Sequence, residues 1–405
     1  MKHSLHGLSE TQWLALSLMP GLGTTRLAHL WTYLDTLHQP QSVEASLFPE
    51  LDESSHSESA IDFQTLRALG WPEHTARAVM LYLNRDKLPY EAESSLQTAL
   101  DWLQSDDQQL VFRGTGNYPA LLGRISVPPT FLYVKGQPSA WDKPTLGMVG
   151  ARAASGYGRK IAEQWGMQMS QQGFSIISGG ARGIDTYAHQ GALNAQQATV
   201  AVMGTGLFHP YPKQNIGLFQ QILEYGGALV SEYPLTTGVR PNFFPPRNRI
   251  ISGMSHGVFV VEASEKSGSL ISARYALEEN REVFALPGRV SDPQASGTNQ
   301  LIRQGATLVT SIDDILAELP RSVRSPVGDV KQDVSALPEG KVDVSGFSIS
   351  AQTLVEVFQQ ERIGLDFDAL VRRTGLPAPE LSQTLMELEL SGVITNAQGQ
   401  YQFSA

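Results

Sequence analysis

The chain has 405 residues, 41% of them hydrophobic, and no cysteine, which excludes disulfides and thiolate metal sites. Its length gives room for two or three domains. No apolar run approaches the ~20 residues that span a bilayer, and the first residues lack the apolar core of a secretory signal. We therefore expect a cytoplasmic protein that makes no membrane contact.

The net charge of −10 argues against a nucleic-acid partner, but this charge is distributed unevenly. Residues 110–310 carry 17 Lys and Arg against 11 Asp and Glu, which gives this stretch a net charge of +6. The two flanks together carry 13 basic and 29 acidic residues, a net charge of −16. A basic middle between acidic ends is the distribution that local phosphate binding requires, although solvated charge also segregates by chance.

Residues 1–85 show helical leucine spacing, interrupted at residues 20–24 (Pro-Gly-Leu-Gly-Thr) and again at residues 69–72. The intervening stretch, residues 50–62, is rich in Ser and Glu and is expected to be an exposed loop. The first turn resembles a helix-hairpin-helix element, whose N–H groups can face a phosphate, but the acidity of this region favours a plain interhelical turn. We predict a helical domain of the SAM or helix-hairpin-helix kind over residues 1–90.

From about residue 145, short apolar runs alternate with helix-like segments. The expected strands cover residues 145–149, 174–177, 199–203, 228–230, 257–261 and 282–286, and the expected helices 159–172, 186–196, 215–224 and 269–280. Continuous apolar strands separated by helices are typical of a parallel sheet covered on both faces. We predict an α/β fold with a Rossmann-like parallel sheet over residues 110–320, whose ligands bind at the carboxyl ends of the strands.

The C-terminal part reads as a linker followed by a small domain. Residues 321–350 are rich in Ser, Pro, Val, Gly and Asp without periodicity, which indicates the linker. Residues 351–405 show three helical segments and a terminal hairpin, the pattern of a winged-helix domain. The third helix, residues 377–391, contains three glutamates and no Lys or Arg, so we expect it to contact protein rather than read a DNA groove.

Glycine-rich segments follow the first three expected strands of the sheet. The residues assigned to phosphate binding there are Gly150, Arg152, Ser178, Gly179, Gly180, Arg182, Gly204, Gly206 and Lys213. Small residues let main-chain N–H groups approach an anion, and arginine offers a planar fork that matches phosphate oxygens. Because parallel strands end at one edge of a sheet, the three segments are expected to hold successive phosphates of one strand.

After the fourth strand, the sequence predicts a long loop in which arginines alternate with aromatic residues. Its candidate DNA-binding residues are Arg240, Phe243, Phe244, Arg247, Asn248 and Arg249. Bases of single strands stack on aromatic rings, with about 1–3 kcal/mol for each base, while cations follow the backbone. One of the two phenylalanines is expected to anchor the loop to the core instead. Arg247 and Arg249 have a structural alternative, which is to pair with Glu232 or Glu262.

The order of these motifs resembles the DprA (Smf) family of DNA-processing proteins. The resemblance is carried by residues 149–152, 178–185 with His189, 211–212, 231–232, 244–249, 267–269, 287–288 and 297–302. It is dense over residues 110–310 and looser in the flanking domains. The sequence departs from the family pattern at Ala151, where Thr or Ser is common, and at Ser272, where Thr is common.

This resemblance implies a cytoplasmic, homodimeric protein that binds and protects single-stranded DNA and loads the recombinase RecA onto it during natural transformation. By motif position, it implies that Arg152, Lys213 and the segment from Arg240 to Phe243 contact the DNA. It implies a binding protein that is not an enzyme and uses no cofactor.

An enzymatic function is the alternative. No Gly-x-Gly-x-x-Gly motif follows the first strand and no Gly-x-x-x-x-Gly-Lys-Ser/Thr loop is present, so neither dinucleotide nor P-loop chemistry is indicated. The rival is a nucleotide-cleaving phosphoribohydrolase on a related fold, whose Pro-Gly-Gly-x-Gly-Thr-x-x-Glu segment is missing here. Asp185, His189, Glu232 and Glu262 are isolated candidates, and Asp185 and His189 are expected to form a structural hydrogen bond one helical turn apart. The histidines show no close-spaced ligand set, so we expect no metal.

Overall fold

The structure of the chain is a computed structural model. It describes residues 4–38, 61–320, 323, 348, 350–351, 354–355, 357, 365–391, 393–397 and 400–403. These residues belong to two compact units, residues 1–328 and residues 329–405. Most of the predicted linker and most of the predicted loop at residues 50–62 lie outside the described residues. Within the described ranges, no helix is long and apolar enough to span a membrane.

The first unit begins with a helical part. Its described elements are β1 (Ser4–Leu5), β2 (Leu8–Ser9), α1 (Glu10–Ser17), α2 (Thr24–His38), α3 (Phe63–Ala68), α4 (Glu73–Arg85) and α5 (Tyr90–Trp102). The two predicted turns, at residues 20–24 and 69–72, separate α1 from α2 and α3 from α4, as expected. The helices enclose Trp13, Trp31 and Trp71, and the same core cluster includes Phe131 and Tyr133 of the following sheet. The helical part therefore shares a core with the sheet, and the domain limit near residue 90 stays a prediction.

The centre of the first unit is a mostly parallel sheet. In spatial order its strands are β11 (Thr307–Leu308), β10 (Glu282–Ala285), β9 (Gly257–Val260), β5 (Thr145–Val149), β6 (Ser175–Ser178), β7 (Thr199–Val202), β8 (Ala228–Ser231), β4 (Phe131–Gly136) and β3 (Gln108–Phe112). The strands from β11 to β8 are parallel, whereas β4 and β3 are antiparallel. The six predicted strands are confirmed, with ends that differ by at most one residue. The antiparallel edge was not predicted.

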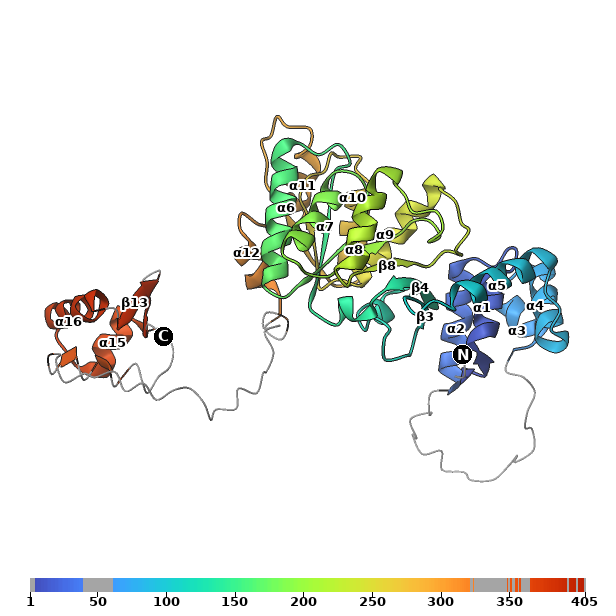
Figure 1. Ribbon diagram of the computed structural model, residues 1–405, viewed down its shortest axis with the longest axis horizontal. Coiled ribbons are helices and arrows are strands. Elements are labelled where there is room, and N and C mark those ends of the chain that lie inside the picture. Colours follow the sequence, from blue (N-terminus) through green and yellow to red (C-terminus); the bar gives the residue numbers. More distant parts are fainter. Residues whose placement is uncertain are drawn as a thin grey trace, which may run out of the picture. The chain divides into compact units, whose positions relative to one another are not determined.

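Helices cover both faces of this sheet (Figure 1). One face packs against α6 (Gly156–Gln171), α7 (Ile184–Asn194), α8 (Ile216–Glu224) and α12 (Ile312–Glu318). The other packs against α9 (Phe244–Gly253), α10 (Ser269–Glu278) and α11 (Ser296–Arg303). Successive residues of one strand point to opposite faces of the sheet. Met148 packs in the core beneath α6 and α7, and Val149 packs in the core beneath α9 and α10. The Rossmann-like prediction is thus confirmed.

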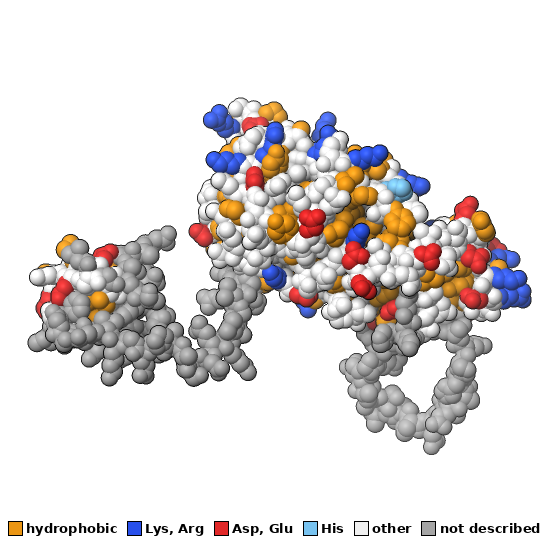
Figure 2. Space-filling model, viewed as in Figure 1, with side chains coloured by type: hydrophobic (Ala, Val, Ile, Leu, Met, Phe, Trp, Pro, Cys, Tyr) orange, Lys and Arg blue, Asp and Glu red, His pale blue; other side chains and the backbone are white. Residues whose placement is uncertain are grey.

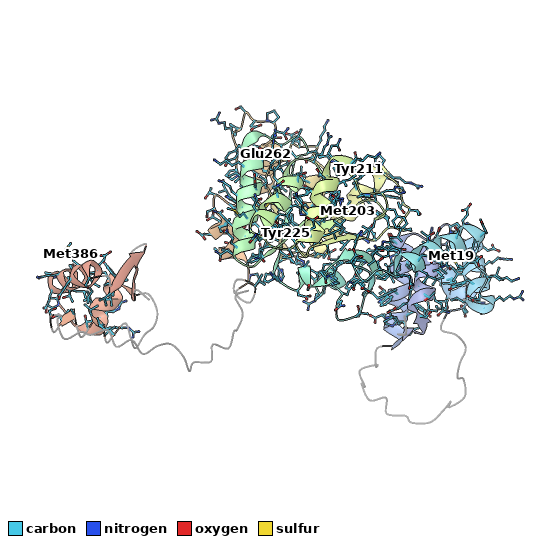
Figure 3. All side chains as sticks on the ribbon, viewed as in Figure 1. Met19, Met203, Tyr211, Tyr225, Glu262 and Met386 are labelled. Atoms are coloured by element: carbon cyan, nitrogen blue, oxygen red, sulfur yellow. The ribbon has the colours of Figure 1, made fainter. Side chains whose placement is uncertain are left out.

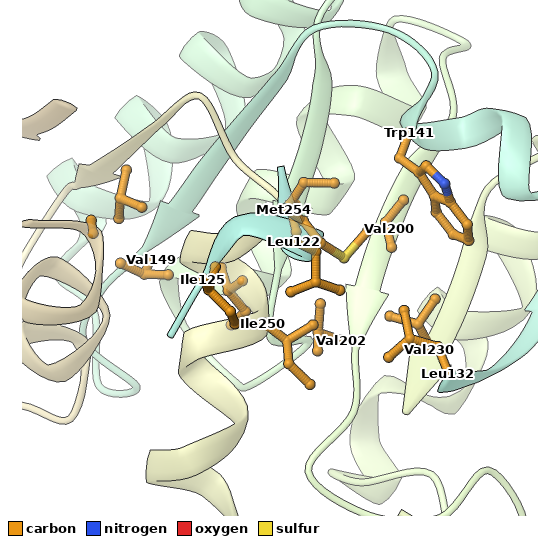
Figure 4. Packing of buried hydrophobic residues seen from close by; sticks show 14 of the residues in the cluster. Leu122, Ile125, Leu132, Trp141, Val149, Val200, Val202, Val230, Ile250 and Met254 are labelled. Atoms are coloured by element: carbon orange, nitrogen blue, oxygen red, sulfur yellow. The ribbon is translucent and has the colours of Figure 1, made fainter. Parts of the chain in front are cut away.

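The helix α9 corrects the predicted long loop after the fourth strand. Pro241–Phe243 forms a short 3-10 turn, η4, and α9 follows at once. Pro245 and Pro246 lie in the first helical turn, where the missing N–H groups would have had no partner in any case. Figure 4 shows Ile250 and Met254, at the end of α9, packed beside Leu122 and Ile125 over the sheet. The first turn of α9 therefore has a fixed position at the sheet's carboxyl edge.

The second unit confirms the winged-helix prediction. Its described elements include β12 (Leu365–Asp366), α15 (Phe367–Thr374), α16 (Ala378–Leu390), β13 (Ile394–Ala397) and β14 (Gln400–Phe403). The strands form an antiparallel sheet in the order β12-β14-β13, so that β13 and β14 form the expected wing. Leu370, Leu381 and Leu388 are fully buried between the helices.

Candidate nucleic-acid interface

The carboxyl ends of β5 to β9 bring the glycine-rich segments to one edge of the sheet. The chain order reverses at β5, which has β6 on one side and β9 on the other. Such a switch point opens a crevice in which doubly wound sheets bind their ligands. Figure 3 marks this edge by Tyr211 and Glu262, and Figure 2 shows Lys and Arg side chains gathered along it.

A narrow cleft at this edge is the most basic part of the site. The residues that line this basic cleft are Arg152, Gly179, Ala181, Arg182, Tyr211, Pro212, Phe244 and Arg247. Arg152 and Arg182 are exposed, as is Lys213 next to the lining Pro212, and no lining residue of the cleft is acidic. Three loops far apart in the sequence thus place cations around one opening. Tyr211 was not among the predicted site residues, although its position two residues before Lys213 offered a signal.

Phe244 lies at the centre of the basic cleft. The guanidinium carbons of Arg152 and Arg247 lie 5.6 Å and 5.8 Å from its ring centroid, and the Tyr211 ring lies 5.8 Å away. These are the distances of cation–π contacts, so the ring helps to hold the arginines in place. Its own side chain is half-buried, which leaves part of the aromatic surface open at the edge.

Phe243 has a different environment from its neighbour. Its ring stacks on Tyr233 at a centroid distance of 4.5 Å and an angle of 11°, and the Tyr233 hydroxyl donates to its carbonyl oxygen at 3.1 Å. Arg240 lies 5.5 Å above the ring. Both phenylalanines thus have an aromatic neighbour, but only Phe243 is stacked face to face on it.

Arg247 is buried and connects two of the strand ends that form the cleft. Its guanidinium donates to the carbonyl oxygens of Gly179, at 2.9 Å, and Val202. Burial lowers the pKa of Arg247 to about 10, partly offset by Asp185, so the side chain stays charged at neutral pH. These donors connect the ends of β6 and β7; a direct contact of Arg247 with DNA stays a prediction.

Arg249 takes the structural role that the sequence left open. It makes a bidentate pair with Glu232, with N–O distances of 2.8 Å and 2.7 Å. Burial lowers the pKa of Arg249, but the adjacent Glu232 carboxylate outweighs this and raises it above its ordinary value. The Arg249 side chain is only 11% exposed. The structural alternative, pairing with Glu232, is therefore realised and links β8 to α9, while a contact of Arg249 with DNA stays a prediction.

The buried glycines at the strand ends serve close packing rather than open anion cradles. The Gly179 N–H donates to Asp185 at 3.1 Å, and the Gly206 N–H to the Thr237 carbonyl oxygen at 2.9 Å, so neither faces solvent. A Cβ atom at Gly179 would lie 2.7 Å from the Arg247 guanidinium, and one at Gly204 would lie 2.7 Å from the Phe244 ring. The prediction that these N–H groups bind phosphate is corrected for Gly179 and Gly206.

Two further predicted residues also have internal partners. The Ser178 hydroxyl donates to the Met148 carbonyl oxygen at 2.6 Å. The Asn248 amide donates to the Gly268 carbonyl oxygen at 3.2 Å and accepts from Arg247. Gly150 and Gly180 take their expected places at the ends of β5 and β6.

The isolated acid–base candidates each have their own partner and do not form a common catalytic group. His189 meets Thr199, at 2.9 Å between Nδ1 and Oγ1, rather than Asp185, so the expected Asp185–His189 hydrogen bond is wrong. Asp185 instead accepts from the N–H groups of Gly179 and Ala181, and burial raises its pKa while Arg247 opposes that shift. Glu262 accepts from the Ser155 N–H at 2.9 Å and from its hydroxyl. Among the described residues no three His, Asp or Glu side chains gather as metal ligands.

Comparisons with known proteins place this site in a family. Residues 109–320 match the family model described as DNA recombination-mediator protein A, and residues 362–400 match the DprA winged helix domain. The chain is 38% identical over 312 residues to protein Smf of Escherichia coli (strain K12), covering 76% of this chain and 80% of that protein. The chain belongs to the DprA (Smf) family.

Other DprA proteins agree with this assignment. The chain is 42% identical over 204 residues to the DNA processing protein DprA of Bacillus subtilis (strain 168), which covers 50% of this chain and 68% of that one. The X-ray structure of DNA processing protein A from Streptococcus pneumoniae is similar with a TM-score of 0.61 and 30% identity, and the match covers 79% of this chain and 99% of that chain. The resemblance in the motifs is confirmed, and the DprA family gives the chain a role in DNA recombination.

Proposed function

We propose that this DprA family member binds single-stranded DNA along the carboxyl edge of its sheet. Arg152, Arg182 and Lys213 hold the phosphates, while the half-buried ring of Phe244 receives a base. The observation that carries this proposal is the basic cleft, where exposed cations from separate loops surround a half-buried aromatic ring. Cations beside stacking platforms are what a single strand requires, because its bases are unpaired.

Membership of the family supports a proposal for the biological role. The chain protects incoming single strands during natural transformation and loads RecA onto them, and it acts as a homodimer in the cytoplasm. The similarity of the chain to DNA processing protein DprA of Bacillus subtilis over the sheet domain supports this proposed role. Two copies would offer two basic clefts to one strand, which increases the effective affinity.

A binding function is favoured over the phosphoribohydrolase alternative by the state of the buried carboxylates. Glu232 is paired with Arg249, Glu262 holds Ser155, and Asp185 accepts two backbone N–H groups. Groups fixed in this way lack the freedom that a general acid or base needs at a substrate. Release of free base from a nucleoside monophosphate by the purified protein would reverse this preference.

A salt titration tests the DNA site. Affinity for a labelled oligonucleotide should fall with salt by a log–log slope of about −0.7 for each neutralised phosphate. The double variant Arg152→Ala with Lys213→Ala should flatten that slope by about one to one and a half units. Lys143→Ala is the control, since this exposed lysine precedes β5 at the opposite edge of the sheet. An unchanged slope in the double variant would contradict the site.

A second assay tests the recombination role. The chain should speed the assembly of RecA filaments on a single strand covered by a single-strand-binding protein, and the double variant should lose this effect. If DNA binding is intact but filaments form no faster, RecA loading is refuted while the DNA site stands.

A further inference from the structure

The connection between β7 and α8, residues 203–215, exposes two aromatic side chains that have no role in the proposed DNA site. Phe208 is 45% exposed and Tyr211 is 39% exposed. Among the described residues, Phe208 is the one phenylalanine with an exposed side chain. Ile216, which begins α8, and Val239, in the loop after β8, are also exposed. Scattered apolar residues on a surface need no explanation, but a group of them on neighbouring loops indicates a binding surface.

The loop after β8, residues 232–240, holds this connection in place. The Phe208 N–H donates to the Leu235 carbonyl oxygen at 3.1 Å. The two backbones approach so closely that a Cβ atom at Gly206 would lie 2.1 Å from the Pro234 carbonyl oxygen. The backbone of Phe208 is thus fixed by its own hydrogen bond, and an ordered loop presents the ring to solvent.

Tyr211 joins this exposed surface to the basic cleft. It lines the cleft, and its ring lies 5.8 Å from the ring of Phe244, which receives a base in the proposed site. Phe208 precedes Tyr211 by three residues, a stretch of chain that spans about 11 Å at most. The rings of Phe244, Tyr211 and Phe208 are therefore within reach of neighbouring bases of one strand.

The charges around these rings fit a phosphate backbone. Residues 203–215 and 233–240 contain His209, Lys213 and Arg240 but no Asp or Glu. All three of these basic side chains are exposed. Aromatic rings accept any base, because every base has a π-face, and cations beside the rings follow the phosphates. A protein partner would also need exposed apolar residues, but the continuity of this surface with Phe244 favours a nucleic-acid strand.

We propose that a bound single strand continues from the basic cleft over this surface, where Tyr211 and Phe208 stack on the bases next to the one on Phe244. Phe208 is thereby a further base-binding residue. The surface accepts a strand of any sequence, because stacking on a ring does not read the edges of a base. This inference rests on the proposed DNA-binding function.

Removal of the Phe208 ring tests the stacking directly. Phe208→Ala should weaken the binding of an oligo(dT) strand about tenfold, which is a usual effect of removing the aromatic platform of one base. A strand of abasic sugars with the same number of phosphates should bind the variant and the wild type equally, because it has no base to stack. The salt dependence of oligo(dT) binding should keep its slope, since the change removes no cation.

Two further variants control for the chemistry and the position of this change. Phe208→Trp keeps a stacking ring and should bind oligo(dT) at least as tightly as the wild type. Tyr225→Ala is the matched control, because Tyr225 is 44% exposed but follows α8 on its way back to the start of β8. It lies apart from Tyr211 (Figure 3), so its loss should leave binding unchanged. Thermal unfolding checks that the variants are folded.

The inference is overturned if Phe208→Ala binds oligo(dT) as the wild type does; slower assembly of RecA filaments by that variant would then assign the surface to a protein partner. It is also overturned if the variant loses equal affinity for oligo(dT) and for the abasic strand, because the ring would then only support its loop. Failure of the proposed DNA site is visible separately. In that case the double variant Arg152→Ala with Lys213→Ala leaves the salt slope unchanged, whatever the effect of Phe208→Ala.

Discussion

Gly204 shows how one residue without a side chain positions the central aromatic ring of the basic cleft. The Phe244 ring occupies the space that a Cβ atom at residue 204 would fill. The ring in turn lies within cation–π distance of two arginines. A single methyl group at this position therefore disturbs an aromatic platform and the cations that it holds.

Gly204→Ala is expected to weaken oligonucleotide binding severalfold while the fold is kept, because the new methyl group, at 2.7 Å from the ring, displaces Phe244. Gly217→Ala is the matched control, since a Cβ atom there meets nothing within 4 Å. Gly217 lies within α8, where alanine should stabilise the chain by about 0.5–1 kcal/mol. Fluorescence anisotropy gives the affinities, and equal affinities would argue against a role for the Phe244 position.

At the same scale, the sequence predicted which residue types gather at the edge but not which of them face solvent. Arg152, Arg247 and Arg249 look alike in the sequence, each in or next to a polar segment. Arg247 is buried because it reaches carbonyl oxygens 68 and 45 residues away. No local pattern contains such partners, so exposure of an arginine has to be read from the assembled fold.

Among the elements, α9 does most to connect the site to the sheet. It carries Phe244, Arg247 and Arg249, and the pair of Arg249 with Glu232 links it to the end of β8. Its helical form was missed because two prolines and two arginines are typical of a loop. The continuous apolar runs of the six predicted strands, in contrast, were sufficient to place those strands within one residue. An apolar run along an element can be recognised in the sequence. A helix cannot be recognised in this way when its first turn consists of prolines, an aromatic residue and an arginine.

Breaking the pair that anchors α9 should be costly. Arg249→Met leaves Glu232, whose side chain is 2% exposed, charged without its partner, and should destabilise the chain by about 3–5 kcal/mol. Replacing both partners, Arg249→Met with Glu232→Leu, should recover most of that loss because no charge stays buried. Urea unfolding measures both free energies. A double variant as unstable as the single one would show that the arginine acts through some other contact.

The contact between α7 and β7 should make stability depend on pH. The Thr199 hydroxyl donates to the Ile176 carbonyl oxygen, so it accepts from His189 Nδ1–H, and the other ring nitrogen has no partner. Burial lowers the pKa of His189 to about 3, with Arg247 adding to the effect. The unfolded chain, with an ordinary histidine pKa near 6.5, binds more protons below that pH, so acid favours unfolding.

This histidine should cost the wild type about 2 kcal/mol of unfolding free energy between pH 7.5 and pH 5.0. His189→Leu should lose about that much less over the same interval, since leucine takes up no proton and Thr199 keeps its own acceptor. Urea unfolding at the two pH values gives the difference. Equal losses in the two proteins would mean that His189 is not held neutral.

For the whole molecule, the second unit is acidic and the basic cleft lies in the first unit. Residues 329–405 carry 5 Lys and Arg against 11 Asp and Glu, a net charge of −6, and the described α16 contains three of those glutamates. The basic cleft belongs entirely to residues 1–328, which form a compact unit with its own cores. Segregated charge was visible in the sequence, but the shared core of the N-terminal helices and the sheet was not, because Trp102 and Tyr133 meet only after folding.

A protein truncated to residues 1–328 should bind an oligonucleotide at least as tightly as the full chain. It retains the cleft and loses a net charge of −6 that repels phosphates at long range. The gain should vanish in 0.5 M salt, where such repulsion is screened within a few ångströms. Anisotropy at two salt concentrations measures this. A marked loss of affinity at both would show that the winged helix contributes to the binding surface.

Arg247 has one more consequence, which concerns entropy. Arg247 fixes the ends of β6 and β7 without a ligand. The cleft therefore becomes ordered when the chain folds and not when a ligand binds. A preorganised surface loses little conformational freedom on association. Strand capture should then be fast and limited by diffusion and electrostatic attraction, and differences between ligands should appear in how slowly they dissociate.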